Sequence, residues 1–265
     1  WYMRKLIINI ENLTKNFGEK VVLKKLNLKI YNSESLAIIG ESGSGKSVLT
    51  KCIDGLLNFD SGKISFNEIK NIKNFSSTER NKYMSKFGIL FQNAALFDSL
   101  TVKENLMFAK KKSDFTEILD EISLPKSILE EYPSNLSIGV QKRIGLARAI
   151  LKEPEILILD EPTTGLDPII AKQINLLIKE VVKKKKITTI TVTHDMDSVY
   201  EYSDYTAFIK EGRIKWYGQS KSIKSSKNND LKNFIMGISW RRLFLENYLI
   251  FDLVILFFLI LSALF

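Results

Sequence analysis

The sequence has 265 residues, which exceeds the usual length of one domain and is enough to bury a substantial core. Hydrophobic residues make up 45% and charged residues 26%, a balance that excludes a wholly disordered chain and a multi-span membrane protein. The net charge of +9 comes largely from scattered lysines and from runs at 110–112 and 183–186, so we expect a solvated lysine-rich surface and no nucleic-acid partner.

The first third of the chain predicts short strands separated by turns, including an antiparallel β subdomain near the N-terminus. The strand at 35–39 runs into a glycine-rich loop, and a helix is predicted from Lys46 to about Leu57. The predicted strands of this part cover residues 5–11, 23–30, 35–39, 62–66 and 86–91.

From about Ser99 to Leu151 the pattern is helical, and Thr101 and Glu104 have the spacing of a helix-starting capping box. We predict that residues 99–150 are an inserted helical subdomain in a core made of residues 4–98 and 151–238.

Beyond Pro154 the pattern alternates between strands and a helix. The apolar run 155–159 is too short for a free-standing helix and suits a strand buried on both faces. A helix at 168–182 leads to a second such strand at 187–193. This order predicts an α/β fold with a mainly parallel sheet flanked by helices, and with the functional site at the carboxyl ends of the strands.

The segment Gly40–Ser47 fits the phosphate-binding P-loop pattern and lies between a predicted strand and a predicted helix, as that pattern requires. Backbone N–H groups would surround phosphate oxygens, Lys46 would neutralise the β- and γ-phosphates, and Ser47 would bind Mg²⁺. A plain serine–glycine turn is the alternative. The residues expected to contact the nucleotide are Gly40, Ser42, Gly43, Ser44, Gly45, Lys46 and Ser47.

Four polar residues follow predicted strands at the same sheet edge. Asp160 could hold Mg²⁺, and Glu161 could orient the attacking water and act as its general base. His194 could contact the γ-phosphate and hold Glu161 in place, although a lone histidine is more often a surface or core residue. Gln92 has an amide that could reach the metal or the water. An exposed Asp-Glu pair is the ordinary alternative for 160–161, and it is improbable downstream of a P-loop.

Together these motifs resemble the ATP-binding subunits of ABC transporters. The segment 136–143 looks like the signature motif of that family, and the resemblance covers residues 5 to about 237. It implies a P-loop NTPase that binds ATP and Mg²⁺ and works with a second copy of itself and a multi-span permease. The matching segments are 40–47, 91–92, 136–143, 160–161, 165–167 and 193–195.

The resemblance also implies roles for four further residues. Phe17 would stack on adenine, although a buried strand-end phenylalanine is nearly as good a reading. In a head-to-tail dimer, Ser137 and Gly139 would contact the γ-phosphate bound to the other copy, and Asp167 would couple the two sites. Ile138 stands where the family most often has glycine. A positive φ there would cost about 1–2 kcal/mol, but we expect Ile138 to be the first helical residue after an N-cap at Ser137, which avoids this cost.

Several segments resemble the ATPases of Mla/Mce-type phospholipid transporters. They are 88–92 continuing into 95–102, then 132–137, and 233–237. This resemblance implies phospholipid transport between envelope membranes, a place at the cytoplasmic face of the bacterial inner membrane, a periplasmic lipid-binding Mce-type protein and a small cytoplasmic accessory subunit.

Residues 239–265 depart from that branch and form a hydrophobic C-terminal tail. The apolar stretch Leu249–Phe265 would reach roughly 26 Å as a helix, which is short of the ~30 Å bilayer core. A tail anchor, a helix buried against a partner, and a truncation or reading-frame accident all remain open, and we favour the last.

Three other functions compete with this one. Another ABC importer or exporter would carry the same motifs. A soluble ABC-class ATPase acting on ribosomes or DNA would normally carry two cassettes or a long coiled coil, and neither is visible here. A P-loop kinase or GTPase would have no reason for the segment 136–143.

Overall fold

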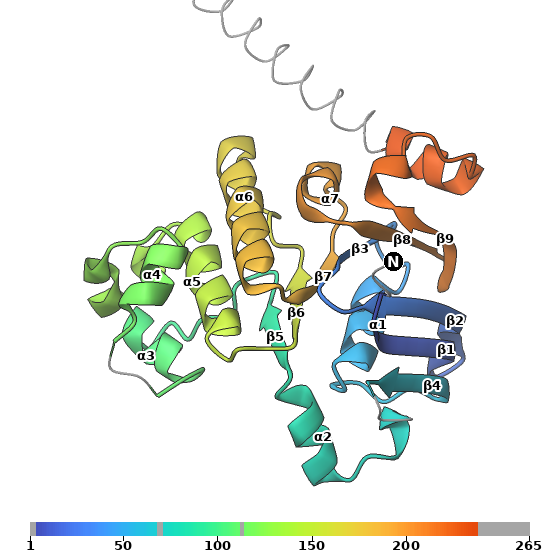
Figure 1. The fold of residues 1–265 in the computed structure, drawn as a ribbon, viewed down its shortest axis with the longest axis horizontal. Coiled ribbons are helices and arrows are strands. Elements are labelled where there is room, and N and C mark those ends of the chain that lie inside the picture. The colour runs from blue at the N-terminus through green and yellow to red at the C-terminus, as the bar shows by residue number, and fades with distance from the viewer. Residues whose placement is uncertain (1–3, 68–70, 112–113, 238–265) are drawn as a thin grey trace, which may run out of the picture. The chain divides into compact units, whose positions relative to one another are not determined.

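The computed structural model describes residues 4–67, 71–111 and 114–237 (Figure 1). The chain divides into a unit up to Ser222 and a second unit from Ile223, which contains a helix over 229–237. The tail predicted at 239–265 lies outside the described residues. No helix in the described part is both long and apolar enough to cross a membrane.

The larger of two sheets has six strands in the order β5-β6-β7-β3-β8-β9. The first five are parallel, and β9 runs antiparallel to β8. The expected mainly parallel sheet is therefore confirmed, whereas β8 and β9 were not predicted. The strands are β3 (Ser35–Ile39), β5 (Phe87–Leu90), β6 (Ile156–Asp160), β7 (Thr188–Val192), β8 (Tyr205–Lys210) and β9 (Arg213–Gln219).

The smaller sheet is antiparallel, with the order β2-β1-β4. It confirms the predicted N-terminal β subdomain, although β1 and β2 are longer than expected. Its strands are β1 (Leu6–Phe17), β2 (Lys20–Tyr31) and β4 (Ser61–Phe66).

Between β5 and β6 the described residues form helices and no strand, as predicted for 99–150. The helix α1 ends earlier than expected, because its cap at Asp54 is followed by Gly55 with φ 83°. The helices α2 and α7 were not predicted. The α-helices are α1 (Lys46–Ile53), α2 (Ser77–Met84), α3 (Val102–Met107), α4 (Thr116–Glu121), α5 (Ile138–Ile150), α6 (Pro168–Lys185) and α7 (Met196–Tyr202), and the short 3₁₀ turns are Ile72–Asn74, Lys126–Glu130, Pro133–Asn135 and Ser220–Ser222.

Strand β6 divides its side chains between two hydrophobic cores. Ile156 and Ile158 belong to the core shared with α1 and the small sheet. Leu157 and Leu159 belong to the core shared with α3, α4, α5 and α6. In Figure 1, α1 lies on one side of the large sheet and α5 and α6 lie on the other. Burial on both faces explains the unbroken apolar run of this strand.

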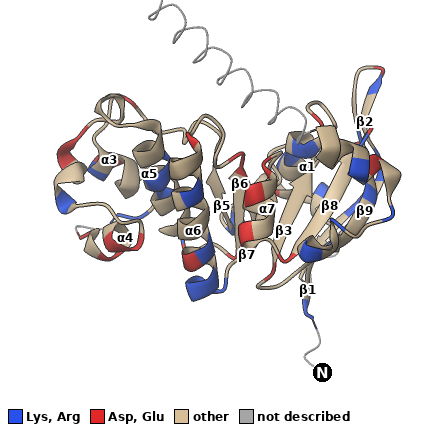
Figure 2. Cartoon of the chain, turned by 90° about the horizontal axis from the view of Figure 1, so that it is seen from above, with Lys and Arg blue, Asp and Glu red and all other residues tan. Residues whose placement is uncertain are grey.

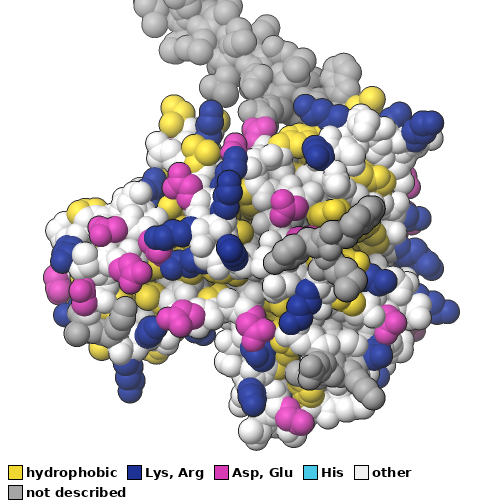
Figure 3. Space-filling model, viewed as in Figure 1, with side chains coloured by type: hydrophobic (Ala, Val, Ile, Leu, Met, Phe, Trp, Pro, Cys, Tyr) yellow, Lys and Arg dark blue, Asp and Glu magenta, His cyan; other side chains and the backbone are white. Residues whose placement is uncertain are grey.

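The positive charge of the chain is spread over the surface and partly paired. Helix α6 ends in three lysines, and Glu121 pairs with Lys184 at 3.0 Å and Lys185 at 2.9 Å (Figure 2). Lysines at the C-terminus of a helix are also stabilised by its dipole. Figure 3 shows Lys and Arg side chains distributed over the face in view, with acidic side chains among them.

A buried asparagine holds the chain that follows β5. The capping box expected at Thr101 and Glu104 is present. Asn105, which is fully buried, accepts from the Phe97 N–H at 2.8 Å and donates to the carbonyls of Phe97, Leu100 and Thr101 at 3.0–3.1 Å. One side chain therefore fixes the backbone of residues 97–101.

The substitution Asn105→Ala should lower the free energy of unfolding by about 2–3 kcal/mol, because it removes four hydrogen bonds and leaves partly buried carbonyls without their donor. Urea unfolding followed by circular dichroism would measure the change. Asn93→Ala, at an exposed site of the same loop, is the control and should stay within about 0.5 kcal/mol. Equal effects of the two substitutions would contradict this account.

Candidate functional site

The P-loop joins β3 to α1 and depends on glycine geometry. A Cβ atom at Gly40 would lie 2.2 Å from the carbonyl oxygen of Ile209 on β8. Gly43 and Gly45 have φ values of 76° and 106°, and Gly45 is the N-cap of α1. These are backbone conformations that L-residues with a side chain rarely adopt. The loop can therefore turn its backbone towards a bound group at the N-terminus of α1.

Lys46 lies over this loop and near the acidic residues. Its Nζ donates to the carbonyl oxygens of Gly40 at 2.8 Å and Glu41 at 2.9 Å. Burial lowers the pKa of Lys46, while the carboxylates of Glu161 and Asp160 favour its charged form. In the described part of the chain, the buried hydroxyl of Ser44 has no hydrogen-bond partner. A phosphate oxygen would satisfy that hydroxyl, so the loop fits the expected nucleotide.

Strand β6 ends at Asp160, and Glu161 follows it in a left-handed conformation with φ 48°. The backbone N–H of Glu161 donates to the carbonyl of Val192 at 2.8 Å, and Thr164 Oγ1 donates to its carboxylate at 3.1 Å. Burial raises the pKa of Asp160, and the nearby Glu161 charge adds to this effect. The carboxylate oxygens of Asp160 are ligands of the kind that a divalent cation such as Mg²⁺ prefers, so this end of β6 fits that cation.

His194 contacts Glu161 directly. Its Nδ1 lies 3.0 Å from Oε1 and 2.9 Å from Oε2 of the Glu161 carboxylate. This hydrogen bond raises the pKa of His194, against the opposing effects of burial and of the Lys46 charge. Glu161 thus lies close enough to Lys46, Asp160 and His194 to influence the charge of each, as expected for strand ends at one edge of a parallel sheet.

A polar network not predicted from the sequence supports the His194 loop. Asp195 caps α7 and accepts from Thr163 Oγ1 at 3.2 Å and Ser198 Oγ at 2.6 Å. Ser198 also bonds Asn175 on α6 at 2.9 Å. The network ties the loop after β7 to the loop after β6. An N-cap signal at Asp195 was available in the sequence.

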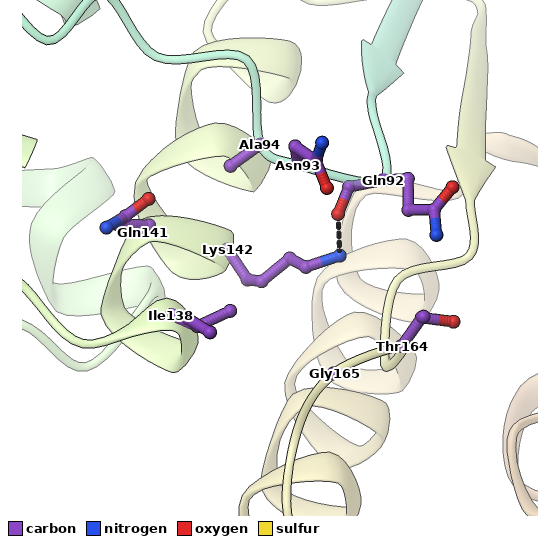
Figure 4. A pocket seen from close by; sticks show the side chains of 8 residues that line it. All are labelled: Gln92, Asn93, Ala94, Ile138, Gln141, Lys142, Thr164 and Gly165. Carbon is purple, nitrogen blue, oxygen red and sulfur yellow. Dashed lines mark hydrogen bonds between the residues drawn. The ribbon is translucent and has the colours of Figure 1, made fainter.

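Gln92 follows β5 and borders a pocket of about 330 Å³, shown in Figure 4. Its main-chain carbonyl accepts from Lys142 Nζ, and its side chain points away from Lys142. The pocket is lined by Gln92, Asn93, Ala94, Ile138, Gln141, Lys142, Thr164 and Gly165.

Four further predicted residues are Ser137, Gly139, Phe17 and Asp167. Ser137 is the exposed N-cap of α5, and Gly139 is buried where a Cβ would lie 2.7 Å from a methyl group of Ile170. Phe17 is 50% exposed at the end of β1, and Asp167 caps α6. Within residues 4–67, 71–111 and 114–237, none of these four hydrogen-bonds to Lys46, Asp160 or Glu161.

Ile138 is the first residue of α5, directly after the N-cap Ser137, whose hydroxyl accepts from the Val140 N–H at 3.4 Å. It is not among the residues with positive φ. The expectation that isoleucine causes no backbone strain at this position is confirmed.

A protein-family model described as "ABC transporter" matches residues 23–164. The chain belongs to the ABC transporter family. It is an ATP-binding subunit of that family, and it hydrolyses ATP with Mg²⁺ as cofactor. A solved structure, the dimeric post-hydrolysis state of the ATP-binding cassette MJ0796 bound to ADP and Pi, is similar to this chain, with a TM-score of 0.71 and 28% identity over 81% of this chain and 99% of that chain.

Curated relatives carry varied names. The Fe(3+) ions import ATP-binding protein FbpC of Fusobacterium nucleatum is 35% identical over 82% of this chain and 59% of its own length, so this chain spans less than two thirds of it. The probable sulfate/thiosulfate import ATP-binding protein CysA of Chlorella vulgaris is 34% identical over 87% of this chain and 99% of its own. The chloroplastic protein TRIGALACTOSYLDIACYLGLYCEROL 3 of Arabidopsis thaliana is 34% identical over 88% of this chain and 74% of its own length.

The substitution Gly40→Ala should lower the free energy of unfolding by about 1–3 kcal/mol and weaken ATP binding, because the new methyl group overlaps the Ile209 carbonyl. Urea unfolding and titration with a fluorescent ATP analogue would measure both changes. Gly237→Ala is the control, since a Cβ there meets no atom within 4 Å and the residue is not among the glycines with positive φ. It should leave ATP affinity unchanged, and equal losses of affinity would rule out the steric explanation.

Proposed function

We propose that this chain powers a membrane transporter by hydrolysing ATP at the edge formed by Lys46, Asp160, Glu161 and His194. The contact between His194 and the Glu161 carboxylate carries this proposal. It holds a carboxylate beside the phosphate-binding lysine, where a general base for attack on the γ-phosphate is needed.

The phosphate-binding roles fall to the P-loop residues Gly40, Ser42, Gly43, Ser44, Gly45, Lys46 and Ser47. Ser47, Asp160 and Gln92 would hold Mg²⁺, which neutralises phosphate charge when bound. Phe17 would stack on adenine, and the ammonium of Lys15, 5.1 Å from the centre of its ring, would support that face. Glu161 would accept a hydrogen bond from the attacking water. One ring nitrogen of His194 holds Glu161, which leaves the other nitrogen to contact the γ-phosphate.

We further propose a head-to-tail dimer in which Ser137 and Gly139 of one copy contact the nucleotide of the other, while Asp167 couples the two sites. The exposure of Ser137 at a helix N-terminus supports such a contact. The dimeric form of the similar ADP-bound cassette supports the assembly.

The substitution Glu161→Gln should reduce kcat by about 10²–10⁴-fold while ATP binding persists, because the amide cannot take a proton from water. We expect ATP to trap this variant as a dimer, which size-exclusion chromatography would detect. Glu155→Gln, at the opposite end of β6, is the control and should turn over normally. Near wild-type hydrolysis by the Glu161 variant would remove Glu161 from the base role.

The permease would dock on the segment after Gln92. Phe97 and Phe108 are 48% and 64% exposed, and their ring centres lie 4.9 Å apart. Met107, which precedes Phe108 in the chain, is 40% exposed. An exposed apolar cluster of this kind suits a partner protein. Such docking would place the chain peripherally at the cytoplasmic face of the bacterial inner membrane.

For the transported species we propose phospholipid, with a periplasmic Mce-type lipid-binding protein and a small cytoplasmic accessory subunit as further partners. The support is the resemblance of 88–92, 95–102, 132–137 and 233–237 to Mla/Mce-type ATPases, and a relative named after a galactolipid. Import of a small solute is the second candidate, because other relatives are named for iron and sulfate import.

Purifying the chain with its permease and reconstituting them in lipid vesicles would separate these two candidates. Phospholipid transport predicts ATP-dependent movement of a fluorescent phospholipid between vesicles or to a lipid-binding acceptor, absent with Glu161→Gln. ATP-dependent uptake of ferric iron or sulfate, without phospholipid movement, would instead establish the importer.

A further inference from the structure

Lys142, in the middle of α5, is a buried lysine with an unusual pair of partners. Its side chain is only 2% exposed. A buried ammonium group is costly unless its N–H groups find acceptors. Its Nζ donates to the main-chain carbonyl of Gln92 and to that of Glu161 at 3.1 Å. Both acceptors are main-chain atoms, so the side chain acts on the position of the backbone.

These two carbonyls belong to loops that are distant in sequence. Gln92 follows β5, Glu161 follows β6, and Lys142 comes from the helix that begins after Ser137. Figure 4 shows Lys142 extending from α5 towards the Gln92 carbonyl, with Thr164 and Gly165 of the second loop nearby. One side chain therefore joins the helix to both loops.

We propose that Lys142 is a positioning residue for ATP hydrolysis, which fixes the backbone of Gln92 and Glu161 relative to the helix that begins at Ser137. This inference rests on the proposed roles of Glu161 as general base and Gln92 at the metal. Lys142 itself would touch neither ATP nor the attacking water.

The conformation of Glu161 explains why such a fixing point matters. Its φ of 48° lies in the left-handed region, which costs a non-glycine residue energy. Its N–H is held by the Val192 carbonyl and its own carbonyl is held by Lys142. Removing the bond from Lys142 would let the Glu161 peptide relax towards a negative φ. The Glu161 carboxylate would then move away from the position proposed for the general base. A misplacement of about 1 Å can cost about 10²-fold in rate.

The positive charge of Lys142 also helps to hold the two acidic residues in place. The ammonium of Lys142 attracts the nearby carboxylates of Glu161 and Asp160, and both favour its charged form although burial lowers its pKa. Lys142 therefore partly balances the negative charge that the two acids bring together.

The same helix offers a matched control. Arg148 donates to the carbonyls of Ala95 at 2.8 Å and Ala94 at 2.9 Å, in the loop that contains Gln92. Like Lys142, it ties α5 to that loop through two carbonyls. It has no hydrogen bond to Gln92 or Glu161 among the described residues.

The test compares Lys142→Met, Lys142→Gln, Arg148→Met and Glu161→Gln in the full-length chain. Urea unfolding gives stability, titration with a fluorescent ATP analogue gives affinity, and phosphate release gives kcat and KM. Lys142→Met should lower kcat by about 10–100-fold, with KM and affinity within about twofold of wild type. Lys142→Gln keeps an N–H donor group on a shorter side chain and should recover part of kcat. Arg148→Met should keep kcat within about threefold despite a comparable loss of stability.

The outcomes separate this inference from the proposed function. Suppose that the Lys142 and Arg148 variants lose similar amounts of kcat for similar losses of stability, while Glu161→Gln is inactive. Lys142 is then merely structural, and the inference is overturned. If Glu161→Gln hydrolyses ATP normally, the proposed base role fails first. Should Lys142→Met not fold, Lys142→Leu takes its place, because it also removes the donor. Normal kcat in that variant at reduced stability would overturn the inference.

Discussion

Parallel pairing of β6 with β7, and of β7 with β3, brings the carboxyl ends of three strands to one edge. Each strand delivers a different chemical group there: the P-loop with Lys46 after β3, the acidic pair at the end of β6, and His194 after β7. The distance from His194 to Glu161 follows from this register, because neighbouring strands lie about 4.8 Å apart. Any change that moved one of these strands along its neighbour would separate the Glu161 carboxylate from His194.

Much of this arrangement could be predicted from local pattern. The predicted strand 35–39 coincides with β3 (Ser35–Ile39), because a short apolar run followed by glycine favours a buried strand over other structures. The capping box at Thr101 and the helical start at Ile138 were also predictable, since both depend on residues within one turn of a helix. The position of Asp160 and Glu161 could also be predicted, because the pair directly follows an apolar run in the sequence.

The rest depends on contacts that a local pattern does not contain. Strand β9 alternates exposed and half-buried residues and lies at a sheet edge, where its pattern gives a weaker signal than a buried strand. Helix α7 has only 7 residues. Its N-cap Asp195 also accepts a hydrogen bond from Thr163, which is 32 positions away in the sequence. Lys142 belongs to the segment 136–143 that was identified from the sequence, but no contact was predicted for its side chain. Only the fold shows that it is buried against two loops.

The buried Asn105 gives the exposed turn at 97–101 a fixed shape before any partner arrives. A surface that is already ordered loses little conformational entropy on association, so more of the contact energy remains as affinity. It also adapts poorly to a partner of another shape. If a permease docks on this turn, its shape must fit the fixed backbone of residues 97–101. In a cell with several such transporters, this requirement would prevent the ATPase of one transporter from binding the permease of another.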